Sequence, residues 1–230
     1  MTINYQPSNI NLSTASAQAE ISNLWHIKGH HKKCTLELRA LKPKCKPISK
    51  IFKGKNFFTI DALKLAFEAE ALRLNALGYN TYYVMNPIRE DFEGSSATDK
   101  DIAYRDLLLI DIDKVGHKGE SSSDEELQAA RLLSEQIADY LESEGWDEPI
   151  RMMSGNGYHL YYLLGKLPND EKTKALVEGT LQELANKFNN DIVAVDTVVF
   201  NASRNTKVPG TIARKGANTV QRPHRMAVVL

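Results

Sequence analysis

The 230-residue sequence predicts an α+β fold, and three observations carry this prediction. Hydrophobic residues make up 42% of the chain, enough for the core of one large domain or two closely packed subdomains. Strand-like apolar runs are separated by segments with helical spacing. Beyond residue 104 the expected order is strand, helix, strand, strand, helix, strand, which is typical of a ferredoxin-like sheet with helices on one face.

The first hundred residues predict a compact αβ unit. A short helix is expected from Ser13, and the alternation in CTLELRAL predicts the first strand. The clearest helix is TIDALKLAFEAEALRLNALG, with Thr59 as its N-cap and Gly78 as its stop signal. NTYYVMN follows as a strand that Pro87 ends, and a loop of turn formers and charges occupies residues 87–104.

The second half supplies the ferredoxin-like elements. The continuous apolar run in YRDLLLIDID predicts a buried strand, and Ser123 with Glu126 forms a capping box that opens the next helix. PIRMMSGNGYHLYYLL predicts two strands around a glycine-rich turn. A helix from about Asp170 to Phe188 precedes the apolar DIVAVDTVVF, a turn-rich stretch with Pro209 and Gly210, and a last strand at MAVVL.

The composition argues against membrane and secreted proteins. No run of about 18 apolar residues occurs, and the N-terminus lacks a signal-type apolar region, so we expect no membrane partner and a cytoplasmic location. Cys34 and Cys45 fit a reducing compartment. His30 and His31 stand close to Cys34, which leaves a zinc site as an alternative to a basic loop with ordinary thiols.

The formal net charge is zero, but the basic residues are clustered. Ten Lys and Arg residues stand between Lys28 and Lys55 against one acid, Glu37, and six stand beyond Asp196 against none. Each basic segment predicts either a solvated face or a track for phosphates.

Three aspartates are candidate metal ligands. Asp111 and Asp113 are two residues apart on a strand, so their side chains project from the same face. Two carboxylates that close are both ionised only with a cation between them, and hard oxygen ligands suit Mg²⁺ or Mn²⁺. A polar strand end that reaches water is the alternative. Asp196 repeats the arrangement, and a neighbouring strand would complete a three-carboxylate cluster able to hold two cations.

Two further motifs are candidate phosphate-binding elements. In SGNGYH, from Ser154 to His159, the two glycines would let backbone N–H groups approach an anion, and Ser154 and His159 can donate hydrogen bonds. A plain hairpin turn with a surface histidine explains the same pattern. Arg204 and Lys207 are three residues apart at a turn and suit a polyphosphate, unless they are solvated loop cations.

Metal carboxylates, a phosphate-binding turn and a cationic clamp together favour nucleotidyl transfer. A phosphotransferase with a nucleophilic first Asp is an alternative, although Lys114 and Val115 stand where a small hydroxyl residue is expected. A sugar-nucleotide transferase would leave the glycine turn and the Arg204/Lys207 pair without a role. A nucleic-acid-binding replication protein without catalysis is the non-enzymatic alternative.

The ordered motifs resemble those of the archaeo-eukaryotic primase superfamily, specifically the primase-polymerase domains of phages, plasmids and other mobile elements. That superfamily has an apolar DxD motif, an SxxxxH-like motif and an apolar Asp motif, which look like LLLIDID, SGNGYH and VD here. The resemblance continues through TLELRAL, YYVMNP, FNASRNTKVPGT and RKG...RPHR, and covers most of residues 35–230.

The resemblance implies one primase-polymerase domain over residues 1–230, with an N-terminal αβ subdomain (1–100) packed on a catalytic subdomain (101–230) like an RNA-recognition motif. It also implies a template-directed DNA primase or DNA polymerase that extends and initiates primers in mobile-element replication. Its substrates would be NTPs or dNTPs with Mg²⁺ or Mn²⁺ as cofactor, its partner single-stranded or primer-template DNA. Family members often carry a helicase or a zinc module, and we expect a catalytic domain cut from a longer protein.

By position, the resemblance assigns roles to individual residues. It makes Asp111, Asp113 and Asp196 the catalytic, metal-binding carboxylates. Nucleotide-binding roles fall on the turn and the cationic pair, namely Ser154, Gly155, Asn156, Gly157, His159, Arg204 and Lys207. Matches of undefined role near substrate or template are Asn86, Arg89, Arg222, His224 and Arg225.

Overall fold

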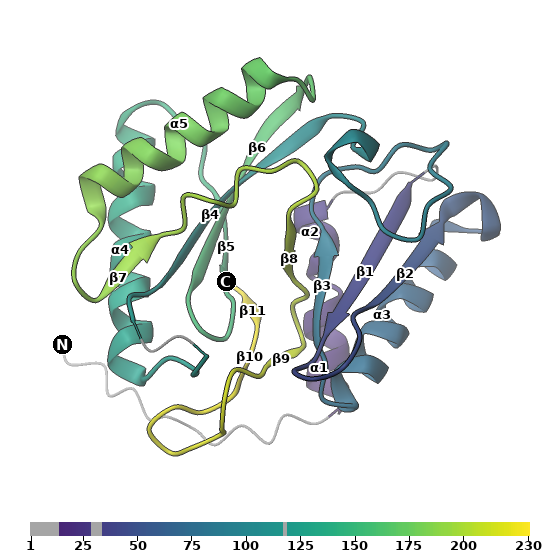
Figure 1. Ribbon diagram of the computed structural model, residues 1–230, viewed down its shortest axis with the longest axis horizontal. Helices are drawn as coiled ribbons and strands as arrows, with labels where there is room; N and C mark the ends of the chain where they lie inside the picture. The colour runs from purple at the N-terminus through teal and green to yellow at the C-terminus, as the bar shows by residue number, and fades with distance from the viewer. Residues whose placement is uncertain (1–13, 29–33, 117–118) are drawn as a thin grey trace.

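The computed structural model describes residues 14–28, 34–116 and 119–230, which form two large antiparallel sheets side by side with helices on their outer faces, and a small two-stranded sheet of Ile212–Ala213 and Arg225–Met226 (Figure 1). The helices are α1 (Thr14–Ile21), α2 (Leu24–Lys28), α3 (Ile60–Ala76), α4 (Asp124–Ser143) and α5 (Glu171–Phe188), with 3-10 turns η1 (Gly54–Asn56) and η2 (Asp99–Asp101). The strands are β1 (Thr35–Leu41), β2 (Ile48–Lys53), β3 (Asn80–Val84), β4 (Arg105–Lys114), β5 (Ile150–Met153), β6 (Tyr158–Leu167), β7 (Val193–Val195), β8 (Asn205–Lys207), β9 (Ile212–Ala213), β10 (Arg225–Met226) and β11 (Val228–Val229).

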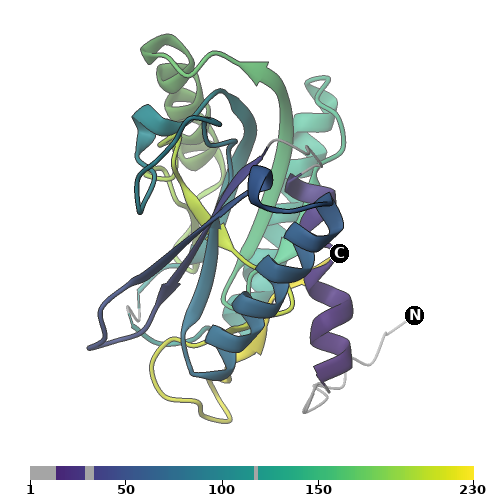
Figure 2. The same ribbon diagram turned by 90° about the vertical axis from the view of Figure 1, so that its right-hand side faces the viewer.

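The first sheet has the strand order β2-β1-β3-β8, and α3 covers one of its faces (Figures 1 and 2). The α3 helix begins as the sequence predicts, because the Thr59 side chain accepts a hydrogen bond from the Ala62 N–H at 3.1 Å. Its apolar stripe, including Leu63 and Phe67, is buried against the sheet. The chain turns out of the helix at Gly78, whose φ of +88° lies in the left-handed region.

The second sheet has the order β11-β5-β6-β4-β7, and all its pairings are antiparallel. Without β11 this is the strand order of a ferredoxin-like or RNA-recognition-motif-like sheet, and α4 and α5 lie on one face (Figure 1). The α+β fold class is therefore confirmed. The capping box of Ser123 and Glu126 is also confirmed at the start of α4.

The last part of the chain connects the two sheets. Strand β8 pairs with β3, so it belongs to the first sheet although it follows β7 of the second sheet in sequence. Strand β11 then returns to pair with β5. Residues after 100 therefore contribute strands to both sheets, and the domain division at residue 100 stays a prediction. Strand β7 ends at Val195, and the apolar residues after Asp196 form a turn instead of continuing the strand.

None of the helices in the described ranges is both long enough and apolar enough to cross a membrane.

Candidate active site

The register of three strands brings the sequence motifs together on one face of the second sheet. Asp111 on β4 lies directly opposite His159 on β6. On the other side of β4, the Asp196 N–H donates to the Asp111 carbonyl at 2.8 Å, immediately after β7 ends. Residues directly opposite each other in antiparallel strands share a face. Asp111, Asp113, His159 and Asp196 therefore start from neighbouring positions on the face that α4 and α5 leave uncovered.

Asp111 and Asp113 form a strongly coupled pair of carboxylates. Burial, then the charge of Asp111, raises the pKa of Asp113 to about 6. Burial alone would raise the pKa of Asp111 as well, but His159 and the cations Arg204 and Lys215 hold it below its usual value. Within the described structure, Asp111 Oδ1 is buried and has no closely aligned hydrogen-bond donor, and His159 Nε2 lies 3.3 Å from it. A buried carboxylate oxygen whose one long contact leaves its remaining lone pair unused, beside a second carboxylate, is the chemistry that a divalent cation fits.

Asp196 lies near this pair, but its side chain is engaged elsewhere. Its charge contributes to the raised pKa of Asp113, whereas its Oδ1 accepts a hydrogen bond from the Val198 N–H at 2.9 Å. Across residues 14–28, 34–116 and 119–230, no group of three or more His, Cys, Asp or Glu side chains is arranged to hold a metal ion. The three-carboxylate, two-metal site thus stays a prediction.

The SGNGYH turn lies directly against the carboxylate pair. A Cβ atom added to Gly157 would stand 2.1 Å from the Ile112 carbonyl oxygen and 2.5 Å from Asp113 Oδ1, so only glycine fits there. Gly155 has a φ of +101°, and a Cβ there would stand 2.5 Å from Ala213 Cβ. The glycines are thus required for packing of the turn on β4 and β9.

Hydrogen bonds hold the turn closed. Ser154 N–H donates to the Gly157 carbonyl at 2.9 Å, and Gly157 N–H donates to Ser154 Oγ at 3.1 Å. The Asn156 Oδ1 accepts from the Ser122 N–H at 3.2 Å, which ties the turn to the loop before α4. Phosphate binding by this turn stays a prediction, and these contacts occupy several of the groups that would serve it.

His159 is buried, and both ring nitrogens face protein groups. Its Nε2 lies 3.3 Å from Asp111 Oδ1, and its Nδ1 lies 2.9 Å from the hydroxyl of Tyr161. The Thr206 hydroxyl is 3.3 Å from the same Nδ1. Direct contact of His159 with a phosphate stays a prediction, and it requires Nε2 to leave Asp111.

The cationic pair predicted from the sequence is divided between two places. The Arg204 guanidinium donates to the Val198 carbonyl and lowers the pKa of Asp111. Lys207 is buried on β8, and its Nζ lies 5.5 Å from the centre of the Tyr82 ring. Burial, and then the charge of Arg214, lowers the pKa of Lys207 to about 7. Arg204 therefore faces Asp111, while Lys207 lies beside Arg214.

Two residues near the carboxylates are additions to the predicted site. Lys215 acts on the pKa of both Asp111 and Asp113. Tyr82 on β3 belongs to the first sheet, yet burial and then the two aspartates raise the pKa of its hydroxyl. In the sequence, Lys215 stands in the second basic segment and in the RKG stretch of the resemblance, without an assigned role. Tyr82 stands in the YYVMNP stretch of the family resemblance, but the sequence assigns it no role, because its closeness to Asp111 arises only when the two sheets meet.

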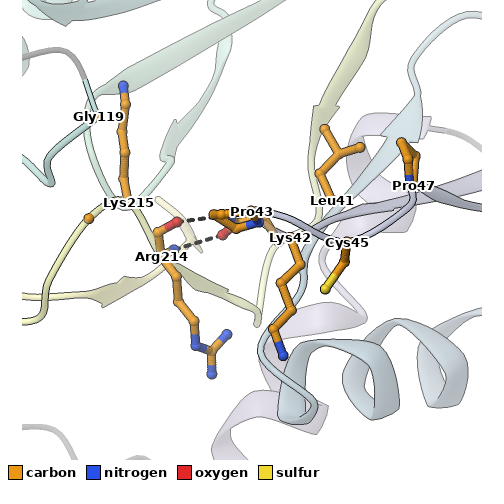
Figure 3. A pocket seen from close by; sticks show the side chains of 10 residues that line it. Leu41, Lys42, Pro43, Cys45, Pro47, Gly119, Arg214 and Lys215 are labelled. Atoms are coloured by element: carbon orange, nitrogen blue, oxygen red, sulfur yellow. Dashed lines mark hydrogen bonds between the residues drawn. The ribbon is translucent and has the colours of Figure 1, made fainter.

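An open pocket of about 390 Å³ adjoins this region (Figure 3). The turn between β1 and β2 forms one side with Leu41, Pro43, Cys45 and Pro47, and Gly119 with Arg214–Gly216 forms the other. Asn80 fixes the second side, because its amide pairs with the backbone of Arg214 at 2.7 Å in both directions. The pocket combines apolar walls with cationic residues.

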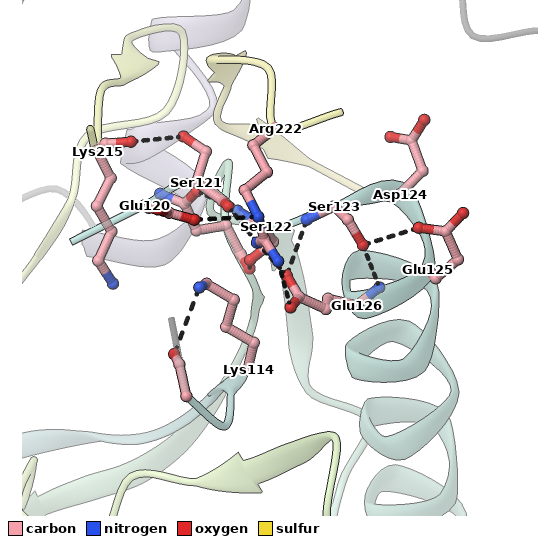
Figure 4. A network of polar contacts seen from close by, with 12 residues as sticks. Lys114, Glu120, Ser121, Ser122, Ser123, Asp124, Glu125, Glu126, Lys215 and Arg222 are labelled. Carbon is pink, nitrogen blue, oxygen red and sulfur yellow. Dashed lines mark hydrogen bonds and ion pairs between the residues drawn. The ribbon is translucent and has the colours of Figure 1, made fainter. Parts of the chain in front are cut away.

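A network of ion pairs holds the loops around the site (Figure 4). Arg222 contacts both carboxylate oxygens of Glu126 at 2.6 and 2.9 Å and also donates to the Ser121 carbonyl at 2.7 Å. Arg225 donates to the Ser122 carbonyl and to Asp124. These two arginines, which match family positions of undefined role, therefore anchor the loop before α4.

The other three matched positions make local contacts. The Asn86 amide is buried, donates to the Ala202 carbonyl and accepts from the N–H groups of residues 106 and 107. Arg89 pairs with Asp91 at the surface, and the His224 ring contacts the Gly216 carbonyl at 3.1 Å.

The first basic segment is partly neutralised. Lys50 pairs with Glu70, and Lys53 and Lys55 both pair with Glu93. Lys28 is half-buried and donates to three backbone carbonyls. The number of basic residues in this segment therefore overstates the positive charge that is available to bind phosphates. Of the four residues considered for a zinc site, Cys34 and Cys45 are free thiols in the structure, and His30 and His31 lie outside the described residues.

The overall structure is similar to solved structures of primase and polymerase domains. Primase RepB' aligns with a TM-score of 0.51 at 12% identity over 93% of this chain and 56% of that chain. The polymerase domain of Ligase D from Mycobacterium tuberculosis, in complex with DNA, aligns with a TM-score of 0.52 at 14% identity over 92% and 80%. The catalytic domain of primase RepB', in complex with initiator DNA, gives 0.51 at 12% identity over 93% and 83%.

No protein-family model matches the sequence, and no curated protein matches it. The chain spans 56% of the length of the longer RepB' structure. At these identities the likeness establishes the fold, and it agrees with the order of sheets and helices described above. The chain therefore shares the fold of these primase and polymerase domains.

Proposed function

We propose that the protein is a template-directed nucleotidyltransferase, a DNA primase or polymerase that adds nucleotides to a primer and initiates primers in mobile-element replication. The observation that carries the proposal is the pair of buried carboxylates Asp111 and Asp113, in which Asp111 Oδ1 has only a long contact of 3.3 Å with His159, at the meeting of two sheets with the fold of primase and polymerase domains.

In this proposal Asp111 and Asp113 hold the divalent cation, and Asp196 joins them when its carboxylate leaves the Val198 N–H. Bound Mg²⁺ or Mn²⁺ would lower the pKa of the attacking 3′-hydroxyl and stabilise charge on the phosphate oxygens. Arg204 and Lys215 neutralise the triphosphate as cations near the carboxylates. Lys207, whose pKa burial lowers to about 7, would be held in its charged form by the bound phosphates. The pocket beside Lys215 accommodates part of the nucleotide or of the template strand.

DNA is the proposed template. Two of the similar structures were solved with DNA, and the second basic segment, beyond Asp196, contributes the cations nearest the carboxylates. Affinity that depends on such cations falls as the salt concentration rises. A helicase is the expected partner in replication.

The test is incorporation of labelled nucleotide on single-stranded and primed DNA, with Mg²⁺ or Mn²⁺ and with separate ribo- and deoxynucleotide pools. Asp111→Asn and Asp113→Asn should each abolish incorporation while DNA binding and the melting temperature change little, because a ligand is lost but no core volume is. The exposed Asp147→Asn is the matched control and should incorporate as the wild type does. Full incorporation by either site variant would overturn the proposal.

A DNA-binding replication protein without catalysis is the second candidate. The contact of Asp196 with Val198, which leaves the three aspartates unassembled, favours it. Such a protein would retard DNA in a gel and incorporate nothing with either metal. A DxD phosphotransferase, in contrast, would release phosphate without a template.

A further inference from the structure

A chain of buried hydroxyl groups leads from the first sheet to Asp111. The Tyr161 hydroxyl on β6 lies 2.9 Å from His159 Nδ1 and 2.5 Å from the Thr206 hydroxyl on β8. Tyr161 is 1% exposed and Thr206 is 2% exposed. A buried polar network of this kind is either fully satisfied or costly. These two side chains and the imidazole of His159 thus form one connected unit behind the carboxylate.

The positions of the hydrogens in this unit follow from which groups can donate and which can only accept. An ionised Asp111 only accepts, so the ring hydrogen of His159 belongs on Nε2, which faces Oδ1 at 3.3 Å. Nδ1 must then accept, and Tyr161 donates to it. Thr206 in turn donates to the Tyr161 oxygen. The three contacts Nε2–Asp111, Tyr161–Nδ1 and Thr206–Tyr161 then each receive one hydrogen, and the longer Thr206–Nδ1 contact of 3.3 Å receives none. A ring hydrogen on Nδ1 would instead leave two lone pairs facing each other across the Asp111 contact.

The unit crosses the boundary between the sheets. His159 and Tyr161 belong to β6 of the second sheet, and Thr206 belongs to β8, which is paired with β3 in the first. Lys207 follows Thr206 and projects to the opposite face of β8, toward the Tyr82 ring. Strand β8 therefore carries Thr206, which connects to Asp111 through Tyr161 and His159, on one face and the Lys207 side chain on the other.

We propose that Tyr161 and Thr206 are positioning residues that hold His159 with its hydrogen on Nε2 and thereby set the orientation of Asp111 for a divalent cation. This inference rests on the proposed function. Partners in a second layer that orient a ligand side chain typically account for 10- to 100-fold in metal affinity or activity. Neither Tyr161 nor Thr206 needs to touch the nucleotide for this role.

The test uses variants that remove single hydroxyl groups without changing shape. Tyr161→Phe and Thr206→Val should each weaken Mn²⁺ binding about 10-fold, measured by electron paramagnetic resonance of free Mn²⁺. In the metal-free protein, nitrogen NMR of the His159 ring should show the Nε2–H form in the wild type and a mixture of both forms in these variants. Incorporation should show a lower kcat with little change in the nucleotide KM.

The chain offers two matched controls. Tyr162 is the next residue on β6, and its buried hydroxyl has no hydrogen-bond partner in the described structure, so Tyr162→Phe should keep wild-type Mn²⁺ affinity. Thr206→Ser keeps the hydroxyl donor and should keep the Mn²⁺ affinity that Thr206→Val loses. A purely structural role of the hydroxyl groups would lower the melting temperature without changing the His159 ring form.

The outcomes separate this inference from the proposed function. Wild-type Mn²⁺ affinity and an unchanged ring form in both Tyr161→Phe and Thr206→Val would overturn the positioning role, whatever the incorporation assay shows. A wild type that binds no Mn²⁺ would overturn it as well. A wild type that binds Mn²⁺, loses affinity in Tyr161→Phe and yet incorporates no nucleotide would support the positioning role and refute the polymerase.

Discussion

Substitution of Gly157 by alanine provides a sharp test of how the turn supports the carboxylates. The added Cβ would stand 2.1 Å from the Ile112 carbonyl oxygen and 2.5 Å from Asp113 Oδ1, while real Cβ contacts stay beyond 3.0 Å. The Asp113 carboxylate can rotate away, but Ile112 offers a backbone oxygen inside the β4–β6 ladder. The turn and β4 must therefore separate by about 1 Å.

Both stability and activity should respond to Gly157→Ala. Overpacking of this kind costs roughly 1–3 kcal/mol, to be measured by urea denaturation. A displacement of about 1 Å at the reacting groups should lower kcat about 100-fold in the primed incorporation assay.

The helix residue Gly179 is the matched control for this substitution, because a Cβ there meets no atom within 4 Å. Gly179→Ala should stabilise the protein by about 0.5–1 kcal/mol and leave incorporation unchanged. A Gly157→Ala variant with wild-type kcat would refute the claim that the turn positions Asp113.

Three further predictions concern charged side chains. Lys207→Met should raise the nucleotide KM several-fold with little change in kcat, and an unchanged KM would remove Lys207 from the triphosphate site. The lowered pKa of Lys207 also predicts that the stability of the protein depends on pH. Its folded pKa of about 7 lies below the unfolded value of 10.5, so the unfolded state binds more protons in between and stability rises with pH from about 7 to 10.5. Lys207→Met should remove up to about 1.4 kcal/mol per pH unit of this slope in urea denaturation series, and equal slopes in both proteins would contradict the burial argument. Glu126 behaves in the opposite way: its bond to Arg222 lowers its pKa from 4.5 to about 2, so its contribution is present above pH 4.5 and lost as the pH falls toward 2. Glu126→Gln should cost about 2 kcal/mol at pH 7 and almost nothing near pH 2, and a cost independent of pH would exclude the ion pair as its source.

Local signals in the sequence predicted the elements that carry the site. The run before Asp111 identified β4, and Thr59, Ser123 and Glu126 placed two helix starts, because side-chain caps and apolar runs act within a few residues. Strand β2 was not expected. Its ISKIFK segment is only partly buried, and its basic residues obscured the pattern.

Contacts between distant residues could not be predicted in the same way. The positions of Asp111, His159 and Asp196 on neighbouring strands depend on register, which no local pattern encodes. The role of β8 was hidden because its three residues lie in a segment rich in turn formers. Phosphate binding by the SGNGYH turn remains a prediction, and the packing of Gly157 against Ile112 and Asp113 could be seen only in the structure. The three-carboxylate cluster remains a prediction.

The late position of β8 in the sequence has a consequence for biosynthesis. Until residues 205–207 leave the ribosome, β3 presents an open edge with unpaired backbone groups, and the buried Tyr83 lacks its cross-strand partner Thr206. Long-range closure of this kind delays folding and exposes nascent chains to aggregation. We therefore expect a fragment of residues 1–100 to show no cooperative urea transition, so that the N-terminal unit acquires its stability only when the C-terminal segment arrives.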